Sequence, residues 1–76
     1  MIQVLITGSS KGIGKAIANR FLKEREFEVY GIDILPSSIN HKRYRHFIAD
    51  ICSKDNLKII SDKIGAINIL INNAGV

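Results

Sequence analysis

The chain has 76 residues, of which 46% are hydrophobic and 24% are charged, and its formal net charge is +4 at pH 7. This composition excludes a disordered chain, and the length allows at most one small domain with a marginal core. The single cysteine, Cys52, excludes an intramolecular disulfide and offers no metal-ligating cluster; we expect a core thiol in a reduced, cytoplasmic setting. No apolar run is long enough for a membrane span, so neither export nor a membrane partner is expected.

The first predicted strand, 2–6, leads into a glycine-rich turn and then a helix predicted from about Gly12 to about Arg25. The expected inward face of this helix consists of Ile13, Ala16, Ile17, Phe21 and Leu22. Gly8 is expected to take a positive φ, whereas Gly12 and Gly14 allow a phosphate and the strand to approach closely. Because the N–H groups of a first helical turn favour an anion, this strand, turn and helix predict a phosphate-binding loop.

The second predicted strand, 28–33, completes a βαβ unit and ends at Asp33. In dinucleotide-binding folds, the carboxylate that contacts the adenosine ribose lies about 20 residues after the last loop glycine. Asp33 follows Gly14 at close to this spacing. The alternative is an ordinary aspartate that opens a turn. Residues 34–44 show turn chemistry, so the crossover helix is expected to be short or absent.

A third strand is predicted over 45–50, and the basic cluster at 41–46 is interpreted as a solvated loop and strand start rather than a nucleic-acid surface. Ser53 is expected to cap a second helix that ends at Gly65, with its inward face formed by Leu57, Ile60 and Ile64. The last predicted strand, 67–71, runs into two asparagines. Buried amides are costly unless they are hydrogen-bonded, so these side chains should brace the strands or contact a ligand.

The stretch Thr-Gly-x-x-x-Gly-Ile-Gly at 7–14 resembles the cofactor loop of short-chain dehydrogenases/reductases, and the Asp-Ile pair at 50–51 and Asn-Asn-Ala-Gly at 72–75 follow in that family's order. The resemblance implies an α/β, Rossmann-like parallel sheet of about four strands in the order 3-2-1-4, with helices on both faces and the fold truncated. Residues 1–76 would form a single partial NAD(P)-binding domain.

By this resemblance, the helix-opening loop holds the pyrophosphate, the end of the second strand meets the ribose, the Asp-Ile pair reads adenine, and the last motif lies against the cofactor. The residues so implied are Gly8, Ser10, Lys11, Gly12, Ile13, Gly14, Asp33, Ile34, Asp50, Ile51, Asn73, Ala74 and Gly75. Asp33 would repel a 2′-phosphate and Ile34 supplies no positive charge for it. Lys11 favours that phosphate, but by the resemblance the Asp33 carboxylate is nearer to it, so NAD is predicted over NADP, with NADP possible.

The catalytic serine and Tyr-x-x-x-Lys of that family are not in the sequence, because isoleucine stands four residues beyond both Tyr30 and Tyr44. No catalytic residue and no metal ligand is therefore predicted. We expect the dinucleotide-binding part of an oxidoreductase, inactive alone, whose last strand has a free edge that favours self-association or a complementary C-terminal half. The alternatives are a non-catalytic nucleotide-responsive module and, less favoured, a basic nucleic-acid binder.

Overall fold

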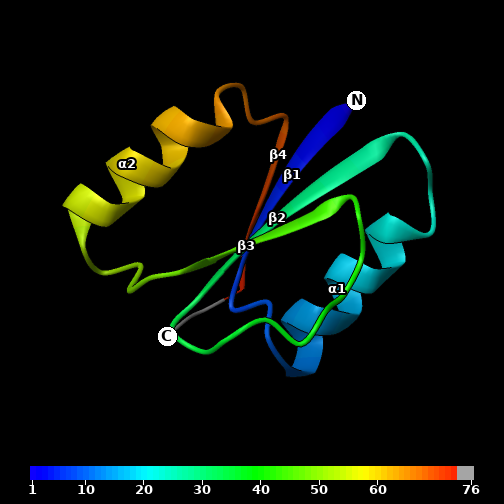
Figure 1. Cartoon of the computed structure of the whole chain (residues 1–76), viewed down its shortest axis with the longest axis horizontal. Coiled ribbons are helices and arrows are strands. Elements are labelled where there is room, and N and C mark those ends of the chain that lie inside the picture. The colour runs from blue at the N-terminus through cyan, green and yellow to red at the C-terminus, as the bar shows by residue number, and fades with distance from the viewer. Residues whose placement is uncertain (74–76) are drawn as a thin grey trace.

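The computed structural model describes residues 1–73. Its four strands form one parallel sheet, and a helix lies on each face of this sheet (Figure 1). In chain order the elements are β1 (Ile2–Thr7), α1 (Gly12–Leu22), β2 (Phe27–Asp33), β3 (Tyr44–Ile48), α2 (Lys54–Ile64) and β4 (Ile69–Asn72). The strand order is β3-β2-β1-β4, and each neighbouring pair is parallel. This order confirms the Rossmann-like topology predicted from the sequence.

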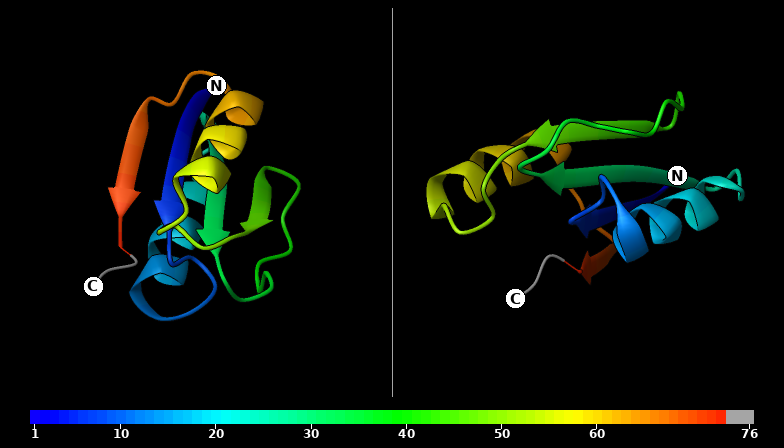
Figure 2. Two further views of the ribbon diagram at one scale, coloured as in Figure 1. Left: turned by 90° about the vertical axis from the view of Figure 1, so that its left-hand side faces the viewer. Right: turned by 90° about the horizontal axis from the view of Figure 1, so that it is seen from below.

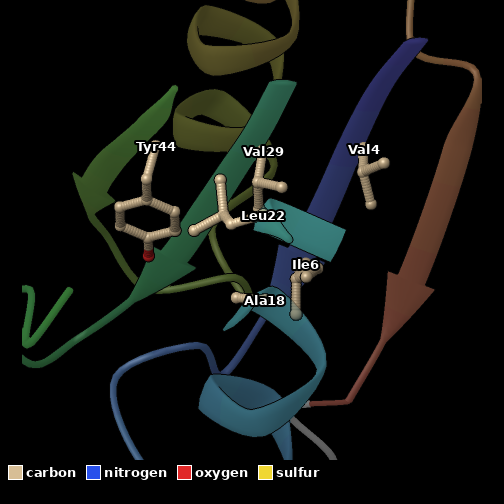
Figure 3. Packing of buried hydrophobic residues seen from close by; sticks show 6 residues of the cluster. All are labelled: Val4, Ile6, Ala18, Leu22, Val29 and Tyr44. Carbon is tan, nitrogen blue, oxygen red and sulfur yellow. The ribbon is translucent and has the colours of Figure 1, made fainter. Parts of the chain in front are cut away.

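The two helices cover opposite faces of the sheet (Figures 1 and 2). Successive strand residues point to opposite faces, so Val4 and Ile6 of β1 pack with Ala18 of α1, as Figure 3 shows. Leu5 of the same strand faces the other side and packs with Ile60 of α2. The carboxyl ends of the parallel strands therefore share one edge, and that edge lies between two covered faces.

The strand β4 lies at one edge of the sheet and contains no fully buried residue (Figure 2). It pairs with β1 on one side, and within residues 1–73 no strand pairs with its other side. Leu70 is 62% exposed on the α2 face, whereas Ile69 and Ile71 are half-buried on the α1 face. The free edge that the sequence predicted is thus present in the described part of the chain.

Helix α1 ends at Leu22, earlier than the predicted end near Arg25. The stop comes from Arg43, whose guanidinium donates to the carbonyl oxygens of Leu22 at 2.6 Å, Glu24 at 2.8 Å and Phe27 at 2.6 Å. These carbonyls belong to the end of α1, the turn after it and the first residue of β2, and the orphan acceptors of a helix end need partners. A cation from the loop before β3 therefore takes the place of a glycine stop.

The predicted inward face of α1 is partly wrong. Gly14, Ala18 and Leu22 are the buried residues of the helix, whereas Ile13 is 72% exposed and Ala16 is also exposed. The helix is rotated toward its small residues because Gly14 and Ala18 allow its backbone to approach the sheet closely.

The third strand occupies 44–48 rather than 45–50, so Asp50 lies beyond it in a turn. Its carboxylate Oδ1 accepts the N–H of Cys52 at 2.8 Å, a contact that forms the turn after the strand. Cys52 is exposed and is not the expected core thiol, because the strand has ended before the chain reaches it.

The remaining elements agree closely with the sequence predictions. Residues 34–43 contain no helix, Ser53 caps α2 by accepting the N–H of Asn56 at 3.3 Å, and Gly65 follows the helix with a φ of 80°. The last strand begins at Ile69 instead of residue 67 because Asn68 makes a reciprocal pair with Gln3, the side chain accepting at 2.8 Å and the backbone donating at 2.9 Å.

Candidate functional site

The glycine-rich loop runs from the end of β1 to the start of α1, at the edge where the parallel strands end (Figure 2). Gly8 has a φ of 69° and Gly12 a φ of 62°, which are left-handed conformations that favour glycine. The N–H of Gly8 donates to Ile32 of β2 at 2.8 Å, so the loop leaves the sheet only after that bond. The positive φ predicted for Gly8 is confirmed.

Gly14 is the point of closest approach between α1 and the loop. A Cβ at this position would lie 2.0 Å from the carbonyl oxygen of Gly8 and 2.6 Å from Nδ2 of Asn73. The same Nδ2 donates to that carbonyl oxygen at 3.2 Å. The first turn of the helix, the loop and the end of β4 are therefore in direct contact only because residue 14 has no side chain.

The two asparagines at the end of β4, Asn72 in the strand and Asn73 after it, brace the sheet, which is one of the two roles expected of them. Thr7 Oγ1 donates to Oδ1 of Asn72 at 3.1 Å, and the N–H of Asn73 donates to Thr7 Oγ1 at 3.0 Å. Ala74 and Gly75, which were also predicted to lie against a cofactor, fall outside the described residues.

The N-terminus of α1 is not capped by a side chain, in contrast to that of α2. The N-cap residue, Lys11, makes no side-chain hydrogen bond to the helix, and no acidic residue occupies the first turn. Helix α2 has both the Ser53 cap and an aspartate, Asp55, in its first turn. Lys11, Gly12 and Ile13 are exposed, so the positive end of the α1 dipole is accessible to an anion.

Asp33 lies at the end of β2, beside this helix N-terminus. Its Oδ2 accepts the N–H of Ser10 at 3.0 Å, and its Oδ1 accepts the N–H of Leu35 at 3.1 Å. Burial alone would raise the pKa of Asp33, but the N–H donors of Ser10 and Leu35 outweigh it and lower the pKa below its ordinary value. The group is therefore a carboxylate near neutral pH. Ile34 beside it is 68% exposed and carries no charge.

Asp50 and Ile51 follow β3, the neighbouring strand. The N–H of Ala49 donates to the carbonyl oxygen of Asp33 at 2.9 Å, which joins the ends of β2 and β3. Asp50 is exposed, and Ile51 is half-buried against the cluster under α2. Hydrogen bonds join the glycine-rich loop directly to Asp33 and Asn73. Asp50 and Ile51 have no such bond to the loop among those described, and β3 places them at the same edge of the sheet.

A groove of about 360 Å³ opens on the α2 face near this edge. It is lined by Leu5, Thr7, Ile32, Ile51, Leu57, Ser61, Ile67, Leu70 and Asn72. Its walls are mostly apolar, with polar groups from the ends of β1 and β4. Ile51 is the residue of the predicted site that this groove contains.

A buried hydrogen-bonded network that no sequence pattern predicted lies beside the loop. Ser9 Oγ and Tyr44 Oη lie 2.8 Å apart, and Tyr44 Oη lies 2.8 Å from Nδ1 of His46. His46 Nε2 in turn lies 2.9 Å from the carbonyl oxygen of Leu35. Ser9 and Tyr44 are 35 residues apart in the chain, so no local pattern could have paired them.

The described residues contain neither a candidate metal-ion cluster nor a helix that could span a membrane. Within residues 1–73 there is no group of three or more His, Cys, Asp or Glu side chains that could hold a metal ion. The helices of the same part of the chain are all too short or too polar to cross a membrane.

Comparison with known proteins gives one consistent family. The family model described as short chain dehydrogenase matches residues 3–76. An uncharacterized oxidoreductase of Saccharomyces cerevisiae is 33% identical over 79 residues, an alignment that covers 96% of this chain and 24% of that protein. The chain thus spans about a quarter of the length of this relative.

Solved structures agree in fold as well as in sequence. A short chain dehydrogenase family protein from Francisella tularensis has a TM-score of 0.88 and 31% identity, and the match covers 100% of this chain and 32% of that one. A short chain dehydrogenase from Leptospira borgpetersenii with bound NAD+ has a TM-score of 0.86 and 30% identity, with 99% and 32% covered. The glycine-rich loop lies against an uncapped helix, a carboxylate stands at the end of β2, and the family model matches nearly the whole chain. The chain therefore belongs to the short chain dehydrogenase family.

Proposed function

We propose that this chain binds a nicotinamide dinucleotide, with NAD preferred over NADP, as the single partial cofactor domain of an oxidoreductase. The observation that carries the proposal is the direct bond between the two halves of the candidate site: the N–H of Ser10, in the loop, donates to the carboxylate of Asp33. This bond places an anion-binding helix N-terminus next to a hydroxyl-binding carboxylate, as a dinucleotide requires. The NAD+ bound by the relative from Leptospira supports the same assignment.

The residues present fit such a cofactor. The exposed start of α1, at Gly12 and Ile13 with Lys11, would hold the pyrophosphate, and Asp33 would accept hydrogen bonds from the ribose hydroxyls. The groove beside Ile51 offers an apolar surface of the kind that an adenine ring needs. When bound, the nicotinamide supplies hydride chemistry between an alcohol and a carbonyl carbon, while this chain's residues bind and orient the nucleotide.

The first prediction concerns cofactor choice. The 76-residue chain is expected to bind NAD about tenfold more tightly than NADP, because Asp33 gains charged hydrogen bonds worth roughly 1.5–3 kcal/mol from free ribose hydroxyls and repels a 2′-phosphate. Chemical-shift titrations on ¹⁵N-labelled protein measure both constants, even for weak binding. NADP bound at least about tenfold more tightly would reverse the assignment.

Two variants sharpen this measurement. Asp33→Asn keeps the size of the side chain but removes its charge, so it is expected to bring the two affinities close together. Asp62→Asn is the matched control, because Asp62 is an exposed carboxylate on α2 that pairs with Lys58 at 3.5 Å, and it should leave both affinities unchanged. Equal effects of the two substitutions would contradict a contact between Asp33 and the ribose.

A second prediction is that this chain alone turns over no alcohol or ketone with either cofactor. Neither tyrosine is prepared to exchange a proton with a substrate. A hydrogen bond to Glu28 at 2.6 Å raises the pKa of Tyr30, and burial raises the pKa of Tyr44. Cofactor absorbance at 340 nm should stay constant with a mass-verified preparation. Reproducible turnover would show that the missing tyrosine and lysine are dispensable.

The contacts within the basic cluster at 41–46 favour dinucleotide binding over nucleic-acid binding as the function of this chain. Arg43 is already engaged by three backbone carbonyls, which removes it from the set of free cations at 41–46. Retention on a nucleic-acid column at physiological salt would argue for the less favoured alternative.

The free thiol of Cys52 supports the proposed cytoplasmic location, where thiols stay reduced.

A third prediction is that the chain associates with itself or with a complementary C-terminal half through β4. The unpaired edge of this strand carries no charge or proline, and Leu70 beside it is 62% exposed. Light scattering at micromolar concentration should therefore show a dimer or a larger species. Leu70→Lys is expected to shift the population toward monomer, whereas Ile59→Lys, at a 53% exposed position on α2, should not. A monomeric wild-type chain would contradict self-association through β4.

A further inference from the structure

The buried network beside the loop connects the two halves of the candidate site by a second route. It starts at Ser9, which is fully buried in the loop, passes through Tyr44 and His46 of β3, and ends on the carbonyl oxygen of Leu35. Each link is 2.8 or 2.9 Å long, which is a good hydrogen-bond distance. Nothing in the proposed binding of pyrophosphate, ribose or adenine uses Tyr44 or His46 directly.

The chemistry of the groups fixes the direction of this network. A carbonyl oxygen can only accept, so Nε2 of His46 carries the hydrogen that bonds to Leu35. In neutral His46, Nδ1 is then an acceptor, and the Tyr44 hydroxyl donates to it. The hydroxyl of Ser9 donates in turn to the Tyr44 oxygen. All three donors are satisfied in one order, from Ser9 to Leu35.

Both ends of the network touch residues that bind the Asp33 carboxylate. Ser9 precedes Ser10, whose N–H donates to Oδ2 of Asp33, while the N–H of Leu35 donates to Oδ1. Ser10 Oγ also donates to the Leu35 carbonyl oxygen, at 3.3 Å. Loop, carboxylate and the segment after β2 therefore form a closed ring of hydrogen bonds through β3.

The backbone of β2 leaves space for this network. A Cβ on Gly31 would lie 1.9 Å from the Tyr44 hydroxyl and 2.1 Å from Ser9 Oγ. Burial raises the pKa of Tyr44, the Ser9 hydrogen bond opposes the shift, and the charge of Asp33 adds to it, so the hydroxyl remains a neutral donor. Two independent features, an absent side chain and a buried donor, thus preserve the same link.

We propose that Tyr44 and His46 are positioning residues for the ribose end of the cofactor site, holding Leu35 against the loop so that Asp33 keeps one orientation. This inference rests on the proposed function. It implies that cutting the network weakens ligands that need Asp33 and spares those that need only the start of α1. A merely structural role would weaken both kinds of ligand together.

The test uses the 76-residue chain and two probes, NAD and inorganic pyrophosphate. Tyr44→Phe removes the central hydroxyl and keeps the ring, and we expect it to raise the Kd for NAD about fivefold, the loss of about one hydrogen bond, with the Kd for pyrophosphate unchanged. Tyr30→Phe is the matched control, because Tyr30 is also 8% exposed and its hydroxyl bonds to Glu28 on the opposite face of the sheet. It should change neither constant.

Ser9→Ala cuts the other end of the network with a smaller change, so it gives a second measurement if Tyr44→Phe does not fold. The ¹⁵N spectrum of the wild-type chain supplies a further signature, since in its neutral form His46 should carry its hydrogen on Nε2. Parallel loss of NAD and pyrophosphate binding in these variants, unchanged NAD binding, or the Nδ1–H tautomer would each overturn the positioning role. Failure of the wild-type chain to bind either probe would instead contradict the proposed function, and with it the inference.

Discussion

Gly14→Ala is expected to lower the free energy of unfolding by roughly 3 kcal/mol, the upper range for inserting a methyl group into a packed site. The new Cβ would lie 2.0 Å from the carbonyl oxygen of Gly8 and 2.8 Å from its carbon, and these are backbone atoms that cannot swing away. Because a domain of this size has only a few kcal/mol of stability, much of the protein should be unfolded at 25 °C. Urea denaturation followed by circular dichroism measures the loss.

Gly12→Ala is the matched control for this substitution. Gly12 has no atom within 4 Å of the position of a Cβ, but its φ of 62° makes alanine strained by about 1–2 kcal/mol. The two variants therefore separate collision from backbone strain. Adding Asn73→Ala to Gly14→Ala should restore little, since the contact with Gly8 remains. An unfolding midpoint of Gly14→Ala at or above that of Gly12→Ala would contradict the close contact.

Arg43→Met is expected to cost about 2 kcal/mol, because it removes three charge-assisted hydrogen bonds at once and keeps most of the apolar stem. The carbonyl oxygens of Leu22, Glu24 and Phe27 would then depend on water, and the turn from α1 to β2 would loosen. Arg43→Lys should recover only part of the loss, since an ammonium does not have the planar fork that reaches three acceptors. Thermal unfolding measures each variant.

The control for charge alone is Arg20→Met. Arg20 pairs with Glu24 at 3.2 Å, but the two side chains are 68% and 50% exposed, so this ion pair should contribute less than about 0.5 kcal/mol. We therefore expect Arg20→Met to have the highest melting temperature of the three variants, Arg43→Lys an intermediate one and Arg43→Met the lowest. Equal melting temperatures for Arg20→Met and Arg43→Met would show that the three backbone contacts do not stabilise the fold.

Local patterns predicted the elements because their signals are local. The apolar run of β1, the glycine spacing and the Ser53 cap each act within a few residues, and the strand order followed from the resemblance that these motifs carried. The inward face of α1 was assigned wrongly for a physical reason. Hydrophobic periodicity gives weight to Ile13, whereas close packing selected the small residues Gly14 and Ala18.

Contacts between distant segments explain the other differences. Arg43 ends a helix formed 21 residues earlier, and the tyrosine of β3 bonds to a serine in the loop. The type of either residue predicts only that it needs a partner when buried, and it does not say which one. The candidate site shows the same division: spacing indicated its glycines and Asp33, and the asparagines were expected to brace the strands, whereas the network of Ser9, Tyr44 and His46 was not predicted.

The contacts of Asn73 couple the glycine-rich loop to the unpaired edge of β4. This residue holds the Gly8 carbonyl through Nδ2, and its strand offers the free edge. Local opening of β4 therefore removes one hydrogen bond that holds the loop, and we expect hydrogen-exchange protection in the two segments to be correlated. By thermodynamic linkage, a ligand that steadies the loop and a chain that pairs with β4 strengthen each other's binding by the same factor.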